Sequence, residues 1–440
     1  MPDEIIVTNG IVVTVNPGFD VISDGRVSIR NGRIVSVGPA VESFQAPFGV
    51  KVIDAAGGII MPGLVNTHTH LPMSLFRGLA DDLPLKDWLN NYIFPAEARY
   101  INENTVRLAS LLSCAEMLLS GTTTFCDGYF LESSVAQAVE EAGMRAVLGQ
   151  GIIDFPAPGV PDPAMKFNAA REFLAEWSGK SFLINPSLFC HSPYTCSAET
   201  LCAAKGLADD FGVKFQIHVA ETRGEADMIA DACGDSSIRH LDNLGVLDEN
   251  TVAIHAVWVD EKDIGIMADR RVSVSHNPES NMKLASGIAP VSAMLDAGIT
   301  LGIGTDGCAS NNAPDMFSAM DMAAKLAKVF SKDPTLFDAK TVLRAATIGG
   351  AELCGLSELT GSLEPGKAAD LIIVNTAKPH LIPLYDPVSH LVYAACGSDV
   401  DTVMVNGRVL VEGGRLVHLD IDGIMDAMID AAKNINIGRK

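Results

Sequence analysis

Short apolar runs alternate with helical stretches through most of the chain, and this alternation predicts a parallel α/β fold. Between residues 62 and 362, eight runs have the length and composition of buried strands. They cover residues 64–68, 122–127, 145–149, 187–191, 215–218, 252–255, 272–276 and 300–306. Helical periodicity separates them, as over residues 103–119 and over residues 133–142, which end at Gly143. Eight such units predict a closed TIM (β/α)8 barrel.

Both ends of the chain instead show short β-type runs joined by turn residues. The clearest turn signals are Asn-Gly pairs at residues 9–10, 31–32 and 406–407. Asn-Gly suits a two-residue hairpin turn, so these pairs predict antiparallel strands. We therefore expect one small β-sandwich built from both chain ends. Its parts would be residues 1–61 and residues 363–440, the latter with a C-terminal helix, and the barrel would occupy residues 62–362.

Composition and charge narrow the classes of partner. The 440 residues are 48% hydrophobic and 20% charged, enough to bury a large core. A net charge of −22 has the wrong sign for binding nucleic acid or an anionic membrane surface. We see no secretory signal or membrane-spanning run. The nine cysteines form no C-x-x-C pair, which favours free thiols and a cytoplasmic location.

Histidines gather at the ends of the predicted strands. Six of the ten lie at or just after such an end: His68, His70, His191, His218, His255 and His276. In a TIM barrel the carboxyl ends of the strands form the active-site face. A single histidine there can be a satisfied structural residue, but six on one face favour metal or proton chemistry.

Three of these histidines and one aspartate, all at strand ends, form a candidate metal site. His68 and His70 are two residues apart, so on a strand both imidazoles face the same side. His218 adds a third nitrogen, and Asp306, between glycines that let the backbone turn sharply, adds an oxygen. Three nitrogens and one oxygen suit one divalent ion, with zinc the first candidate. Taken alone, H-x-H could be two polar residues and Asp306 a turn residue.

The same face carries groups suited to hydrolysis. A metal lowers the pKa of a bound water molecule, and Asp306 can accept its proton. Glu221, which the metal does not need, can carry a proton to the substrate. His255 can hydrogen-bond the attacking water and steady the developing negative charge. The alternative for Glu221 is that it caps the following helix.

Several strings in the chain resemble the amidohydrolase superfamily: M-P-G-L-V-N-T-H-T-H at residues 61–70, H-V-A-E-T at 218–222, and G-T-D-G at 304–307. Longer strings resemble the deaminases of 5′-methylthioadenosine and S-adenosylhomocysteine, namely residues 189–195, residues 275–287, and Trp88 followed by Phe94-Pro-Ala-Glu97. The resemblance runs through nearly the whole chain. It implies the same barrel and split sandwich, and the same ligand and catalytic residues.

The resemblance also implies substrate contacts. Glu97 would accept hydrogen bonds from the ribose 2′- and 3′-hydroxyls, His191 would contact the nucleoside, and Trp88 would wall the pocket. Further contacts would come from Arg145, Gln150 and His276. Residues 187–191 lack the lysine that bridges two metals in other members, which argues for one metal per subunit.

The expected reaction is hydrolytic deamination of adenosines that carry a 5′ substituent. Relatives that bind an amino-acid tail can place arginine where this chain has Gln150, so we expect 5′-methylthioadenosine to be preferred over S-adenosylhomocysteine. One alternative is a guanine or pterin deaminase or a triazine hydrolase on the same scaffold. Another is a non-catalytic assembly protein. The resemblance further implies a homo-oligomer.

Overall fold

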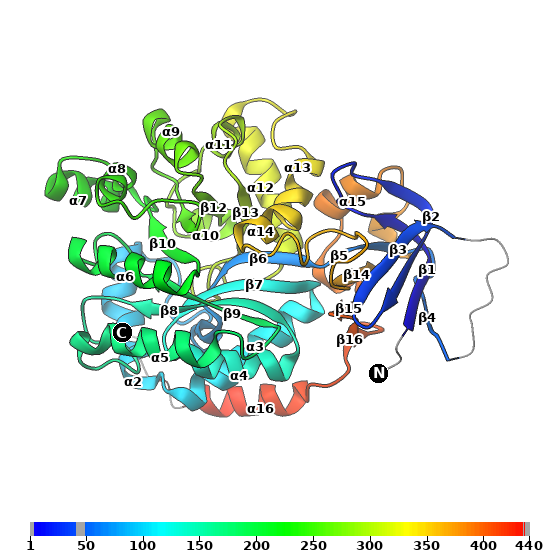
Figure 1. Cartoon of the computed structure of the whole chain (residues 1–440), viewed down its shortest axis with the longest axis horizontal. Helices are drawn as coiled ribbons and strands as arrows, with labels where there is room; N and C mark the ends of the chain where they lie inside the picture. Colours follow the sequence, from blue (N-terminus) through cyan, green and yellow to red (C-terminus); the bar gives the residue numbers. More distant parts are fainter. Residues whose placement is uncertain (1–3, 41–48, 434, 436–440) are drawn as a thin grey trace.

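Eight strands close into a parallel barrel, and their positions follow the eight apolar runs. In this computed structural model, which describes residues 4–40, 49–433 and 435, the ring runs in the order β10-β11-β12-β13-β6-β7-β8-β9 (Figure 1). The strands are β6 (Leu64–Thr69), β7 (Thr122–Tyr129), β8 (Arg145–Ile152), β9 (Ile184–Cys190), β10 (Phe215–Val219), β11 (Thr251–His255), β12 (Ser273–His276) and β13 (Leu301–Ile303). The predicted TIM barrel is confirmed.

Helices cover the outside of the barrel, as the periodicity predicts. They include α3 (Glu103–Leu119), α4 (Glu132–Ala142), α5 (Lys166–Trp177), α6 (Ala198–Phe211), α7 (Arg223–Cys233), α8 (Ser237–Asn243), α9 (Glu261–Asp269), α10 (Pro278–Lys283), α11 (Val291–Asp296), α12 (Met316–Ser331), α13 (Ala339–Ala345) and α14 (Ile348–Leu353). Asn102 caps α3 by accepting the backbone N–H groups of Asn104 and Thr105. Gly143 ends α4 in the left-handed conformation, at φ 78°. None of the helices in the described chain is long and apolar enough to cross a bilayer.

Strands from both chain ends form one nine-stranded sheet beside the barrel. They are β1 (Glu4–Val13), β2 (Val21–Arg30), β3 (Arg33–Pro39), β4 (Lys51–Asp54), β5 (Ile59–Pro62), β14 (Leu371–Val374), β15 (Val400–Val405), β16 (Arg408–Glu412) and β17 (Arg415–Leu416). The antiparallel pairing of β5 with β14 joins the two ends of the chain. The small β-domain built from both ends is thus confirmed. Its exact division from the barrel at residues 62 and 363 stays a prediction, and residues 1–3, 41–48 and 436–440 lie outside the described part of the chain.

Two of the three Asn-Gly pairs form the expected hairpin turns. Asn31-Gly32 joins β2 to β3, Asn406-Gly407 joins β15 to β16, and all four residues have positive φ. Asn9-Gly10 does not form a turn, because β1 continues through it. The pairing of β1 with β2 shifts register between Val7 and Gly10, so this pair makes a bulge within one strand.

The C-terminal helix α16 (Ile421–Ala432) packs against α3 of the barrel (Figure 1). Ile424 lies in a small apolar cluster with Leu111 of α3 and Ala138 of α4. The helix α15 (Pro387–Tyr393) packs on α12 and α13. The end of the chain therefore returns to the barrel after completing the sheet.

The segment between β6 and α3 covers part of the barrel mouth. It contains a 3-10 helix (Leu71–Phe76), α1 (Leu85–Trp88), a π-helical turn (Leu89–Ile93) and α2 (Phe94–Tyr100). A π-turn inserts an extra residue into a helix and is common near functional sites. This segment carries two of the predicted substrate contacts, Trp88 and Glu97.

Candidate active site

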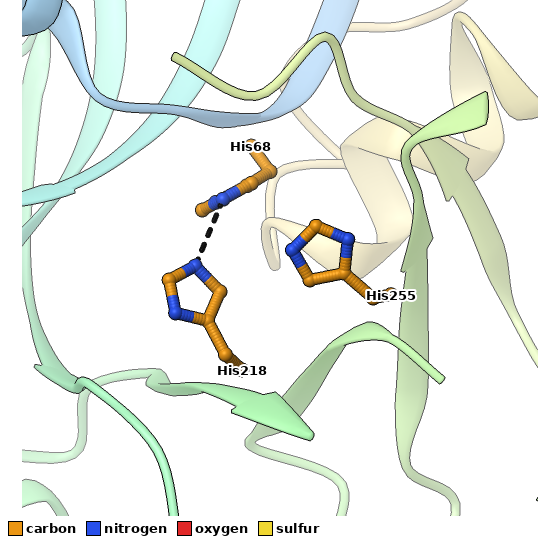
Figure 2. A group of neighbouring side chains, drawn as sticks. All are labelled: His68, His218 and His255. Carbon is orange, nitrogen blue, oxygen red and sulfur yellow. Dashed lines mark hydrogen bonds between the residues drawn. The ribbon is translucent and has the colours of Figure 1, made fainter. Parts of the chain in front are cut away.

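The four predicted metal ligands meet at the barrel mouth. His68 Nε2 lies 3.3 Å from Asp306 Oδ1, and His70 Nε2 lies 3.4 Å from the same oxygen. His218 Nε2 approaches His68 Nε2 at 3.2 Å, and Figure 2 shows these two rings nearly perpendicular to each other with His255 beside them. Ligand atoms of a tetrahedral zinc site lie roughly 3.3–3.4 Å apart, because each is about 2.0–2.1 Å from the metal. The distances from Asp306 Oδ1 to His68 and His70 match this spacing, and these three side chains form one compact group that could hold a divalent ion. His218 Nε2 lies at a matching distance from His68 Nε2, and His218 forms a second such group with His68 and His255.

Neighbouring groups fix the orientation of these ligands. His70 Nδ1 donates to the carbonyl oxygen of Gly128 at 2.6 Å, which leaves the lone pair on Nε2 for a metal. The Ser280 hydroxyl donates to Asp306 Oδ2 at 2.6 Å. Burial lowers the pKa of His68 to about 4, so its imidazole is neutral at neutral pH. A neutral imidazole is the form that binds metal.

The glycines around Asp306 act through close packing and not through an unusual φ. A Cβ on Gly304 would lie 2.9 Å from the Cβ of His68, and one on Gly307 would lie 3.1 Å from the Cβ of His70. It is Asp306 itself that takes a left-handed backbone, at φ 64°. The expectation that the glycines make the turn is corrected: they let β13 approach the two histidines.

Residues with a left-handed backbone also occur at the carboxyl ends of two other barrel strands. Ala220, after β10, has φ 52°, and His255, the last residue of β11, has φ 75°. Such conformations are costly for residues other than glycine and often occur at functional sites. Here each one turns the chain just where a polar side chain enters the mouth.

Glu221 and His255 face each other beside the ligands. Glu221 Oε2 lies 4.0 Å from His255 Nε2, and the Ser286 hydroxyl donates to Glu221 Oε1 at 3.4 Å. Burial raises the pKa of Glu221 above its ordinary value. His255 Nδ1 lies 2.8 Å from Asn281 Oδ1 and 3.3 Å from Asn277 Nδ2, so two amide side chains fix the orientation of its ring.

Glu221 does not cap the helix that follows it. The N-cap of α7 is Thr222, whose hydroxyl accepts the backbone N–H of Glu225. The carboxyl group of Glu221 is therefore free to face the cavity, which removes the structural alternative for this residue.

A cavity opens directly above the ligands and contains three of the predicted substrate contacts, Trp88, Glu97 and His191. The Tyr129 hydroxyl donates to Glu97 Oε1 at 2.5 Å, and among the described residues the second oxygen of Glu97 has no such partner. Burial raises the pKa of Glu97 to about 7, although the bond from Tyr129 acts to lower it. His191 Nδ1 lies 2.9 Å from the Thr195 hydroxyl, and burial lowers the pKa of His191 to about 3.

The other three predicted substrate contacts do not line this cavity. Arg145 lies at the start of β8, the barrel end opposite the mouth, where its Nε pairs with Asp370 Oδ2 at 2.9 Å. It joins the barrel to the β-domain, so the expectation that it contacts substrate is corrected. Gln150 points toward α4 and accepts the backbone N–H of Glu132. His276, the last residue of β12, is buried and is not among the described residues that border the cavity.

Several residues of the site were not singled out from the sequence. Tyr129 ends β7 and binds Glu97, while Asn281 holds His255. Asp127 Oδ1 accepts the Thr69 hydroxyl at 2.6 Å and the Leu71 backbone N–H at 2.7 Å. These two hydrogen bonds fix the position of the residues on both sides of His70. Asp127 and Tyr129 both lie at the carboxyl end of a predicted barrel strand, which is the signal that could have found them.

A second group of metal-type side chains lies outside the barrel mouth. His380 Nε2 lies 2.8 Å from Asp399 Oδ2, and the backbone N–H of Cys396 donates to the same oxygen at 3.0 Å. These groups satisfy one another by hydrogen bonds, so the cluster does not require an ion.

Comparison with known proteins agrees with this geometry. A family model described as the Amidohydrolase family matches residues 59–410. A 5-methylthioadenosine/S-adenosylhomocysteine deaminase from Syntrophobacter fumaroxidans is 45% identical over 98% of both chains. A 5′-deoxyadenosine deaminase from Methanothermobacter thermautotrophicus is 45% identical over 94% of this chain and 95% of its own. The crystal structure of an adenosine deaminase from Xanthomonas campestris with bound zinc superposes with a TM-score of 0.94, at 37% identity and 98% coverage of both chains.

Proposed function

Because the chain belongs to the amidohydrolase family and is a hydrolase acting on C–N bonds, we propose that it deaminates adenosines carrying a 5′ substituent. The products would be the inosine analogue and ammonia. The observation that carries this proposal is that one cavity holds both the His/Asp cluster and the buried carboxyl group of Glu97. The first suits attack on a carbon–nitrogen bond, and the second suits a ribose diol.

We propose that the ion is zinc, one per subunit. His68, His70, His218 and Asp306 would hold it, and when bound it lowers the pKa of a water molecule so that attack occurs near neutral pH. The spacing of these donor atoms supports the proposal. Metal analysis of the purified protein tests it, and a protein that retains all four ligands but binds no ion would favour the non-catalytic alternative.

The proposed roles of the other residues follow from their contacts. Asp306 accepts a proton from the attacking water, and His255 accepts a hydrogen bond from that water through Nε2. Glu221, which burial favours in its protonated form, gives a proton to the ring nitrogen next to C6. The proton held by Asp306 leaves with the amino group as ammonia, and the second proton of the water, released as the C6 carbonyl forms, returns to Glu221. His191 and Trp88 would hold the nucleoside from the sides of the cavity.

We further propose that 5′-methylthioadenosine is preferred over S-adenosylhomocysteine. A second cavity, of about 570 Å³, adjoins the first, and its apolar border includes Leu85, Leu89, Phe94, Phe155 and Met228. This surface suits a thioether tail. Its border includes Lys86 but no arginine among the described residues, so a tail carboxylate would lack a bidentate partner.

An ammonia-release screen tests these proposals. Zinc-loaded protein is given adenosine, 5′-deoxyadenosine, 5′-methylthioadenosine, S-adenosylhomocysteine and guanine, and kcat/KM is measured for each. Ammonia from the adenosines with a higher value for the methylthio compound supports both proposals. A higher value for the homocysteine compound rejects the preference alone, and the Lys86→Met variant then shows whether this lysine binds the tail.

Release of ammonia from guanine alone would favour the competing base deaminase. A second test separates the two, because a base without ribose has no use for Glu97. The Glu97→Ala variant should raise KM sharply for nucleosides if the proposal holds, and leave KM unchanged if the substrate is a free base. A homo-oligomeric state and a cytoplasmic location stay predictions, which size-exclusion chromatography and cell fractionation test.

A further inference from the structure

Glu225 holds the backbone of the turn that carries Glu221. It lies in the first turn of α7 and is buried, with 3% of its surface exposed. Its Oε1 accepts the backbone N–H of Ala220 at 2.6 Å, and its Oε2 accepts the backbone N–H of Glu221 at 2.9 Å. The Ser237 hydroxyl adds a third bond to Oε1, at 3.1 Å.

This arrangement differs from an ordinary helix cap. In a capping box, the acidic residue at the third helical position reaches back to the N–H of the N-cap residue. Here the N-cap is Thr222, and Glu225 reaches past it to the two residues before it. The carboxylate therefore contributes little to the cap of α7 itself. Its two hydrogen bonds instead fix the backbone of Ala220 and Glu221, the two residues that follow β10.

The turn that Glu225 holds needs support. Ala220 has a left-handed backbone, at φ 52°, which costs roughly 1 kcal/mol or more for a residue with a Cβ. Its carbonyl oxygen accepts the N–H groups of Val257 and Trp258, at 3.0 and 2.8 Å, from the loop after β11. Glu225 satisfies the N–H on the other side of the same residue. The turn is thus fixed from both sides in the one conformation that directs the Glu221 side chain into the cavity.

We propose that Glu225 is a positioning residue that acts on the reaction through Glu221. The inference rests on the proposed function, in which Glu221 transfers a proton to the substrate ring. A shift of about 1 Å in a catalytic group can cost two orders of magnitude in rate. A carboxylate is suited to this position because each of its two oxygens accepts one backbone N–H.

The Glu225→Gln variant tests the proposal. Glutamine has the same size but only one acceptor oxygen, so its NH2 group would face one of the two N–H groups. We expect kcat to fall about 10- to 100-fold, with zinc content unchanged and KM changed by less than about 2-fold. Hydrogen exchange should become faster at the Ala220 and Glu221 amides. Asp386→Asn is a control for an acid-to-amide change at a helix start away from the site: Asp386 Oδ1 alone accepts two backbone N–H groups of α15, so asparagine can keep both bonds and kcat should stay unchanged.

A double-mutant cycle shows whether Glu225 acts through Glu221. In a Glu221→Gln background, Glu225→Gln should cost no further rate beyond about 2-fold, because the group it positions is already inactive. An equal loss in both backgrounds would overturn the proposal. Glu225 also borders the outer cavity, so the measurements are repeated with 5′-deoxyadenosine, which has no tail. A rise in KM confined to tailed substrates would show a tail contact and reject the positioning role.

The exchange measurement separates this inference from the proposed function. In one outcome, wild-type protein releases no ammonia from any adenosine, while Glu225→Gln speeds hydrogen exchange at residues 220 and 221. This result would reject the proposed function and support the role of Glu225 in fixing the turn. Active wild-type protein with unchanged kcat and unchanged exchange in the variant would reject the inference and leave the function standing.

Discussion

Replacing Glu97 by glutamine should stabilise the protein at alkaline pH and impair its activity. Glu97 is 4% exposed and accepts a hydrogen bond from the Tyr129 hydroxyl, which can also donate to the glutamine oxygen. Burial raises the pKa of Glu97 to about 7, from an ordinary value of 4.5. Between these two values the folded protein keeps a proton that the unfolded chain has released. Stability therefore falls as pH rises through this window, and the loss is complete above about pH 7.

The size of the effect follows from the two pKa values. Their difference corresponds to roughly 3 kcal/mol at pH 8. Glutamine removes this cost because it does not ionise. For a chain of 440 residues, the gain corresponds to a rise in Tm of roughly 3 °C. At pH 5 the folded protein already holds Glu97 in its neutral form, so most of the difference should disappear.

Differential scanning calorimetry of substrate-free protein at pH 5 and pH 8 measures this prediction. Glu172→Gln, at an exposed position of α5, is the control and should change Tm little at either pH. A similar rise in Tm for Glu97→Gln at both pH values would show a packing effect and refute the reasoning. Activity should move the other way: kcat/KM at pH 8 should fall about 10- to 100-fold, because a charged acceptor of hydroxyl groups is lost.

Three other changes follow from single contacts. His218→Ala should abolish tight zinc binding, because three ligands remain of four, and metal analysis after dialysis measures this. Arg145→Met leaves Asp370 buried without its partner, so it should cost about 3–5 kcal/mol in denaturant unfolding. In folded protein its KM should stay unchanged, since Arg145 lies away from the cavity. Asp127→Ala frees the chain on both sides of His70, and we expect zinc affinity to fall about 10- to 100-fold in a chelator competition.

The barrel, and the meeting of the candidate ligands at its mouth, could be predicted because local signals decide them. An apolar run of four to eight residues defines a buried strand, and the strand ends define the active-site face. The spacing of His68 and His70 places both on one side of a strand whatever surrounds them. His218 and Asp306 followed from their places at the ends of other strands. In each case the prediction needed no knowledge of a distant contact.

The errors arose where a distant contact decides the outcome. Arg145 is a cation near a predicted active site, but Asp370, 225 residues later, fixes it at the other end of the barrel. Asn9-Gly10 has turn chemistry, yet β2 pairs with β1 both before and after it. On the other edge of β1, β4 pairs before it and β5 pairs after it, which keeps the strand continuous. The hold of Glu225 on Ala220 depends on a left-handed residue, which the sequence of an alanine does not signal.

The acidic side chains that border the cavity explain why the site combines buried carboxyl groups with a candidate metal site. Among the described residues, its border contains the acidic groups Glu97, Glu221 and Asp306 but no lysine or arginine. Buried acids without a cation lose their charge, as the raised pKa values of Glu97 and Glu221 indicate. A divalent ion held beside Asp306 would supply positive charge at that one point. The site can therefore hold one ionised carboxylate at the metal and a protonated one within reach of the substrate, which is the pair of states that hydrolytic deamination requires.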